Sequence, residues 1–112
     1  MQIVVSTRHG EISDRLRADA EEQFGKLSRY ESRISRVEVT LSAEKNRWEV
    51  EVLASVDRAE PVHAHGEAGD AKSALDAAAD RMVRQLKRLR SRHVDHQGPG
   101  KEQAPTADEE DA

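Results

Sequence analysis

Two periodicities of hydrophobic positions divide residues 1–96 into strands and helices. Alternation of hydrophobic and polar residues, or a short β-branched run, predicts four strands, over residues 2–8, 37–42, 48–56 and 62–68. Hydrophobic residues spaced by three and four predict two amphipathic helices, over about 13–30 and 71–94. The order β-α-β-β-β-α predicts an α+β fold, a two-layer sandwich in which both helices cover the apolar face of a four-stranded mixed sheet.

Short polar segments mark where these elements begin and end. Ser13 is expected to cap the first helix, and Gly69-Asp70 closes the fourth strand and caps the second helix. Gly25 costs the first helix about 1 kcal/mol relative to alanine and weakens its last turn. The polar turn 43–47 joins the second and third strands as a hairpin. The second helix, at about 36 Å, should overhang strands that span only about 20 Å.

Composition is compatible with one small globular domain over residues 1–96. The chain has 112 residues, of which 36% are hydrophobic and 36% charged, and only Phe24, Tyr30 and Trp48 are aromatic. The core must therefore be aliphatic, and base stacking on exposed rings is not expected. The absence of cysteine excludes disulfides and thiolate zinc sites. No apolar run reaches the roughly 18 residues of a membrane span, and the N-terminus lacks a signal-peptide pattern, so a cytoplasmic location is expected.

The net charge of −4 belongs to the C-terminal segment and not to the domain. Residues 1–96 hold 17 acidic and 17 basic residues, whereas residues 97–112 hold five acids and one lysine. The latter segment is rich in Gly, Pro and Ala and has no periodic apolar face. Residues 97–112 are therefore predicted to be a disordered acidic tail.

The segment RMVRQLKRLRSR, residues 81–92, concentrates six arginines and lysines without an acid. On a helical wheel these bases cluster beside the hydrophobic stripe, with Arg81, Arg84, Arg88 and Arg92 on one flank and Lys87 and Arg90 further round. Like charges one turn apart repel, so the cluster destabilises the helix. The planar fork of arginine fits phosphate oxygens, which double-stranded nucleic acid offers at regular spacing. The segment therefore predicts a phosphate-binding surface, and a solvated face without a partner is the alternative.

A second basic group supports nucleic-acid binding. It comprises Lys26, Arg29, Arg33 and Arg36 at the end of the first helix and in the loop after it, with Arg8 and His9 at the end of the first strand. The exposed face of the sheet carries acids that would repel phosphate, at Glu38, Glu49, Glu51 and Glu67. The predicted binding surface is therefore a helix flank and a loop edge, and not the open sheet.

No motif in the chain predicts catalysis. The sequence has no Gly-x-Ser-x-Gly, no Gly-rich phosphate loop and no cysteine nucleophile, so neither an enzyme nor a cofactor is expected. His63-x-His65 places two imidazoles on one face of a strand, a spacing that metals use. Because no cysteine or carboxylate at ligand spacing accompanies them, no metal site is predicted.

Six segments form an ordered series along residues 1–96. They are the opening MQI strand that ends in Arg8-His9, LSRYESRI (27–34) leading to VEVTL, the EK turn at Glu44-Lys45, VHAHGEAGD (62–70), ALDAAADRMVRQLKR (74–88) and the closing Asp95-His96. In this order and spacing they resemble the short ribosome hibernation-promoting factor and ribosome-associated translation inhibitor family, of S30AE or sigma-54 modulation type.

The resemblance implies a fold related to double-stranded RNA-binding domains and a function in ribosome hibernation. Such a protein binds 16S rRNA of the small ribosomal subunit near the decoding centre, blocks mRNA and the A- and P-site tRNAs, and silences translation under stress or in stationary phase. Its partners are the small subunit and the 70S ribosome or 100S ribosome dimer; the protein itself is monomeric, with no membrane and no small-molecule substrate. By the same resemblance, the RNA-binding residues are Arg8, Lys26, Arg29, Lys45, Arg81, Arg84, Lys87, Arg88, Arg90 and Arg92.

The chain departs from the family pattern at two aromatic positions. Glu31 stands where the family usually has an aromatic residue, and Ala71-Lys72 stands where it usually has Met-Tyr. Three other functions are compatible with the sequence: a general double-stranded RNA-binding protein, a protein-interaction adaptor that docks an acidic partner such as a transcription factor, and a metal-binding module at the histidines.

Overall fold

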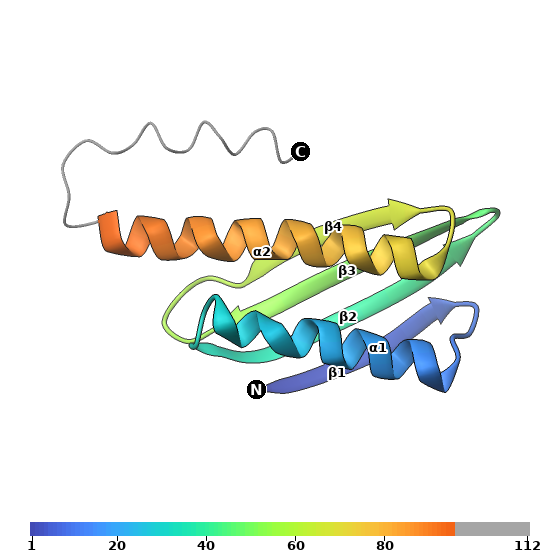
Figure 1. Cartoon of the computed structure of the whole chain (residues 1–112), viewed down its shortest axis with the longest axis horizontal. Coiled ribbons are helices and arrows are strands. Elements are labelled where there is room, and N and C mark those ends of the chain that lie inside the picture. The colour runs from blue at the N-terminus through green and yellow to red at the C-terminus, as the bar shows by residue number, and fades with distance from the viewer. Residues whose placement is uncertain (96–112) are drawn as a thin grey trace.

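The computed structural model describes residues 1–95, with side chains described for residues 1–91 (Figure 1). The elements follow the predicted order, and a short 3₁₀ helix is inserted after the first helix. They are β1 (Gln2–His9), α1 (Asp14–Gly25), η1 (Lys26–Arg29), β2 (Ile34–Glu44), β3 (Arg47–Val56), β4 (Val62–Ala68) and α2 (Ala71–Asp95). The acidic tail predicted from the sequence lies outside the described residues.

One mixed sheet, in the order β1-β2-β3-β4, forms one layer of the fold. β1 and β2 are parallel because α1 connects them, whereas β2–β3 and β3–β4 are antiparallel neighbours. Both helices lie on the same side of the sheet and form the second layer (Figure 1). The predicted α+β sandwich with a four-stranded mixed sheet is confirmed.

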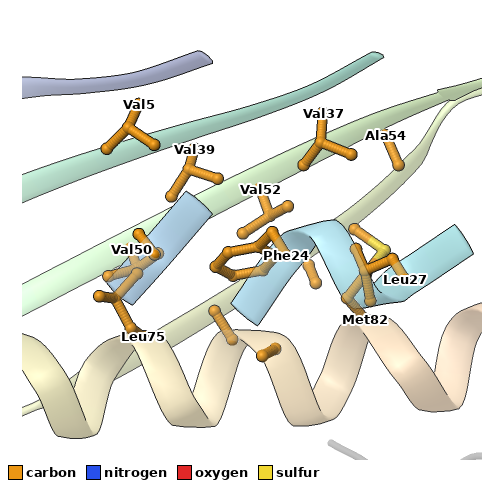
Figure 2. Close-up of a cluster of buried hydrophobic side chains, with 14 of the residues drawn as sticks. Val5, Phe24, Leu27, Val37, Val39, Val50, Val52, Ala54, Leu75 and Met82 are labelled. Atoms are coloured by element: carbon orange, nitrogen blue, oxygen red, sulfur yellow. The ribbon is translucent and has the colours of Figure 1, made fainter. Parts of the chain in front are cut away.

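The core is the aliphatic layer that the alternating pattern predicts. Inward positions of the two central strands are fully buried, among them Val37 and Val39 of β2 and Val50 and Val52 of β3. These side chains point toward the helices, where the ring of Phe24 fills the centre of the layer (Figure 2). Burial of this layer is the main force that holds the helices on the sheet.

The first helix is shorter than the sequence predicts. Ser13 caps it as expected, since its Oγ accepts a hydrogen bond of 3.0 Å from the backbone N–H of Leu16. The α-helix then ends at Gly25, a poor helix former, and the chain continues as the tighter η1. The tighter turn places Leu27 in the core. The prediction of one helix over residues 13–30 is therefore wrong beyond Gly25.

The connection between β2 and β3 is also tighter than the predicted turn 43–47. Glu44 pairs with Arg47, so only Lys45 and Asn46 lie outside the ladder. Lys45 has a φ of 52°, in the left-handed region that short hairpin loops use. The sequence pattern misses the tight turn because the flanking residues are polar whether they are paired or not.

α2 approaches the sheet closely because β4 has a glycine at the contact. A Cβ atom on Gly66 would lie 2.5 Å from the backbone nitrogen of Ala78 and 2.6 Å from the backbone oxygen of Ala74. Both alanines are fully buried. Only a residue without a side chain fits between the strand and the helix, so this contact fixes where α2 lies along β4.

α2 is longer than β4, the edge strand on which it lies, whereas β2 and β3, with 11 and 10 residues, exceed the predicted strand length of about 20 Å. The 25 residues of α2 span about 37 Å, whereas the seven residues of β4 span about 23 Å. The C-terminal turns of α2 extend past the end of the sheet (Figure 1), which confirms the predicted overhang. Among residues 1–95, no helix combines the length and the apolar character that a membrane span needs.

Replacing Gly66 by alanine should lower the free energy of unfolding by about 1–3 kcal/mol, because a methyl group would overpack the contact between β4 and α2. Each kcal/mol corresponds to a fall in Tm of about 4–8 °C for a domain of this size, which thermal unfolding followed by circular dichroism measures. Gly69→Ala is the matched control, since a Cβ at that position meets nothing within 4 Å. Equal losses in the two variants would contradict the close approach.

Candidate nucleic-acid interface

The basic residues predicted to bind RNA are divided between two ends of the domain. Arg8 is the penultimate residue of β1 and Lys45 lies in the β2–β3 turn, both at the end of the sheet where α2 begins (Figure 1). Lys26 and Arg29 lie on η1 at the opposite end. The other six occupy α2 from Arg81 onward. The structure therefore does not unite all ten residues in one surface.

One side of α2 rests against the edge strand β4. Nη1 of Arg81 donates a hydrogen bond of 3.1 Å to the backbone oxygen of His65, and Nε2 of Gln85 donates one of 3.0 Å to the backbone oxygen of His63. Arg88 lies two turns beyond Arg81 on this side and is half-buried. Arg81 therefore holds the helix on the edge strand, a structural role that the sequence did not predict. Arg92 follows on α2, with its side chain outside the described residues.

Arg84 has an acidic neighbour one turn earlier on the same helix. Its Nη2 lies 3.2 Å from Oδ2 of Asp80, and both side chains are exposed. The pair contributes little to stability because water screens it, but it reduces the positive charge of this part of α2. The i,i+4 spacing of Asp80 and Arg84 could have revealed the pair from the sequence.

The other side of α2 faces η1 and Tyr30, which directly follows η1. Nζ of Lys87 lies 5.6 Å from the centroid of the Tyr30 ring, within the range of a cation–π interaction. Lys26 and Tyr30 line the same groove as Val83 of α2, and Arg29 directly precedes Tyr30 in the chain. The sequence could not show this meeting, because it depends on how α2 lies across η1.

A buried carboxylate, Glu31, stands next to this tyrosine. It accepts hydrogen bonds from Nε of Arg33 at 2.9 Å, from Nη2 at 3.1 Å and from the backbone N–H of the same residue at 2.9 Å. The side-chain bonds from Arg33 are the largest influence on the pKa of Glu31 and lower it, while burial acts in the opposite direction. The charge of Arg90, three residues after Lys87 on α2, lowers this pKa further.

We define the basic surface as Lys26, Arg29, Lys87 and Arg90, whose side chains are all exposed. Beside it, a groove of about 560 Å³ runs between α2 and the α1–η1 segment. Asp76 and Asp80 also line this groove, and their charges would repel phosphate. The basic surface, and not the groove, is therefore suited to bind a nucleic-acid backbone.

Two members of the second basic group form ion pairs with glutamates. Arg33 binds the buried carboxylate described above, and Nε of Arg36 lies 2.9 Å from Oε2 of Glu38. On the exposed face of the sheet, Glu67 is paired in turn with Arg47. That face is therefore less acidic than the sequence predicts, because paired arginines offset two of its four glutamates.

Carboxylates lie beside one of the strand histidines. His63 and His65 share one face of β4 as predicted, but Glu49 of β3 and Glu67 of β4 lie next to His65. The expectation that no carboxylate accompanies the histidines is therefore wrong. Glu67 follows His65 by two residues on the same strand, so spacing could have revealed it. Glu49 lies on the next strand, and its position depends on the register.

Comparison with known proteins identifies the family. The sequence profile described as sigma 54 modulation protein / S30EA ribosomal protein matches residues 3–94. The ribosome hibernation promoting factor of Azotobacter vinelandii is 33% identical over 97 residues, which cover 87% of this chain and 90% of that protein. The ribosome hibernation promoting factor of Escherichia coli (strain K12) is 31% identical over 96 residues, which cover 86% of this chain and 100% of that protein.

Solved structures share the fold. The N-terminal domain of Thermus thermophilus Protein Y superposes with a TM-score of 0.72 at 29% identity, over 80% of this chain and 99% of that one. A ribosomal subunit interface protein from Coxiella burnetii gives a TM-score of 0.72 at 20% identity, over 81% and 99% of the two chains. These matches define a class of ribosome-associated proteins that are not enzymes. The chain belongs to the sigma 54 modulation protein / S30EA ribosomal protein family, as the sequence motifs indicated.

Replacing Glu31 by glutamine should lower the free energy of unfolding at neutral pH by about 1–2 kcal/mol, because the two hydrogen bonds from the Arg33 side chain lose the charge of their acceptor. The loss is modest because the Arg33 side chain is 31% exposed, so that water partly screens its attraction to Glu31. The folded-state pKa of Glu31 lies below its ordinary value of 4.5. The stabilisation is therefore complete above about pH 4.5 and is lost as pH falls through the folded-state pKa. Chemical unfolding at several pH values measures both effects.

The difference between the Glu31→Gln variant and the unsubstituted protein should therefore shrink on acidification. Glu22→Gln, on the exposed surface of α1, makes the same change in net charge and serves as the control. A difference that stays constant down to strongly acidic pH would show that the charge of Glu31 does not stabilise the fold.

Proposed function

We propose that this chain is a ribosome hibernation factor that binds 16S rRNA of the small subunit near the decoding centre. Bound there as a monomer, it excludes mRNA and the A- and P-site tRNAs and so silences translation in the cytoplasm under stress or in stationary phase. The family match and the relatives named ribosome hibernation promoting factors support hibernation as the function. The rRNA contact is inferred from the charges of the domain.

The observation that carries the rRNA contact is the basic surface. The four exposed cations come from η1 and from the C-terminal part of α2, which lie at the same end of the domain (Figure 1). Three or four phosphates of a folded RNA can be reached at once from such a cluster, and each contact releases counterions. The overhang allows α2 to enter a concave RNA surface without contact between RNA and the sheet.

The local packing keeps this surface in place before binding. Lys87 of the surface lies over Tyr30, and the ion pair between Arg33 and Glu31 holds the neighbouring loop after η1. Side chains that are already ordered lose less conformational entropy when RNA binds. Glu31 thus has a structural role at the position where the family usually has an aromatic residue.

The other residues predicted to bind RNA should contribute less to rRNA binding, or should contact a different part of the subunit. Arg81 is hydrogen-bonded to β4 and Arg84 is paired with Asp80. Arg8 and Lys45 lie at the far end of the sheet, so they would need a second contact with the subunit. Binding by the basic surface together with some of these residues neutralises about six phosphates.

For about six phosphates, the logarithm of the affinity for small subunits should fall with the logarithm of salt concentration with a slope of about −4 to −5. Cosedimentation with purified small subunits at three salt concentrations measures this slope. A flat response would contradict an electrostatic mode of binding.

Charge reversal at one residue of each element tests the basic surface itself. Arg29→Glu on η1 and Lys87→Glu on α2 should each weaken binding and make the salt slope shallower by about one, with circular dichroism unchanged. Arg15→Glu is the control, because it changes the net charge equally on an exposed position in the first turn of α1. Equal weakening by all three variants would mean that net charge, and not this surface, determines binding.

The same assay distinguishes the alternative functions. Preference for the small subunit over an isolated RNA duplex supports hibernation, whereas equal binding to both would indicate a general double-stranded RNA-binding protein. Capture of a protein partner that survives RNase treatment, without binding to subunits, would instead indicate an interaction adaptor.

A further inference from the structure

The exposed face of the sheet brings one imidazole and two carboxylates together. Glu49 of β3 is paired in register with Glu67 of β4, and His65 precedes Glu67 by two residues on the same face. One potential ligand atom from each of these three residues lies within 4.8 Å of the other two. The sheet faces away from both helices here, so the cluster is separate from the basic surface.

The three groups form a donor set that suits zinc. Zn²⁺ binds imidazole nitrogen and carboxylate oxygen at about 2.0–2.2 Å and takes four ligands in tetrahedral geometry. Neighbouring ligands are then about 3.4 Å apart. Small rotations of these partly or fully exposed side chains would close the difference from the observed separation, and water can supply the fourth ligand.

The two carboxylates of the cluster repel each other, and a bound cation would relieve that repulsion. Glutamates directly opposite each other on neighbouring strands repel, which destabilises the pairing of Glu49 with Glu67. Arg47 offsets this repulsion in part, since its Nε and Nη2 both donate to Oε1 of Glu67 and lower the pKa of that carboxyl, and the charge of Arg81 lowers it further. Among residues 1–91, no hydrogen bond reaches Oε2 of Glu67, so this oxygen can face a metal ion.

The geometry points to a zinc-binding site formed by Glu49, His65 and Glu67 on the open face of the sheet. Arg47 competes with the metal for Glu67, and His63, on the same strand face, takes no part. The site and the basic surface lie on different faces and share no residue. The inference therefore does not depend on the proposed function.

Calorimetric titration of Zn²⁺ into the full chain near neutral pH tests this site. His65→Gln and Glu49→Gln should each weaken Zn²⁺ binding about tenfold or more, as expected for loss of a ligand, and should abolish the rise in Tm that saturating Zn²⁺ produces. His63→Gln is the matched control and should leave both readings unchanged. Circular dichroism checks that each variant is folded, and Mg²⁺, which requires oxygen ligands, should have no comparable effect.

Several results would overturn the assignment. Unchanged Zn²⁺ affinity in both the His65 and Glu49 variants would place the metal elsewhere on the chain. Equal loss in His63→Gln would remove the distinction between the two histidines, and an equal effect of Mg²⁺ would show that the imidazole is not a ligand. Arg47→Gln should tighten binding several-fold because it releases Glu67, and an unchanged affinity would contradict the role given to that carboxylate.

Discussion

The contact between Gly66 and the backbone of α2 fixes where the helix lies on the sheet, and the charged contacts of α2 depend on that position. Because no side chain separates β4 from the helix, Ala74 and Ala78 lie directly on the strand. This position turns one side of α2 toward the edge strand, where Arg81 bonds a backbone carbonyl, and the other side toward η1. A close steric fit in the core therefore decides which charged residues of α2 meet which neighbours.

Charge in this domain is arranged by local pairing more than by overall balance. Arg33, Arg36 and Arg47 each bind a nearby carboxylate, which balances their charges locally. The cations left on the basic surface come from two elements that are far apart in the sequence. The acids left on the sheet lie on the opposite face of the fold. A chain whose first 96 residues are neutral in sum thus presents one face suited to phosphate and another suited to a cation.

The sequence was sufficient for features that depend on short-range pattern, and insufficient for those that depend on register or helix placement. Alternation and helical spacing predicted the element order, the layers and the long second helix. The end of α1 was placed too late because Leu27 of η1 keeps the apolar spacing of the helix. The loop at Lys45 was placed too wide because polar flanks look alike in paired and unpaired backbone. The proximity of His65 to Glu49 depends on strand register, and that of Lys87 to Tyr30 depends on helix packing, so neither could be read from spacing.

Directed hydroxyl-radical probing of small subunits would test the orientation of the bound protein most directly. The chain has no cysteine, so a single cysteine can carry the iron chelate at a chosen position. Ser28 on η1 and Ser91 on α2 are exposed beside the basic surface, whereas Ser6 is exposed on β1. If the basic surface faces the ribosome, Ser28→Cys and Ser91→Cys will give the strongest cleavage of 16S rRNA. Equal or stronger cleavage from Ser6→Cys would contradict this orientation.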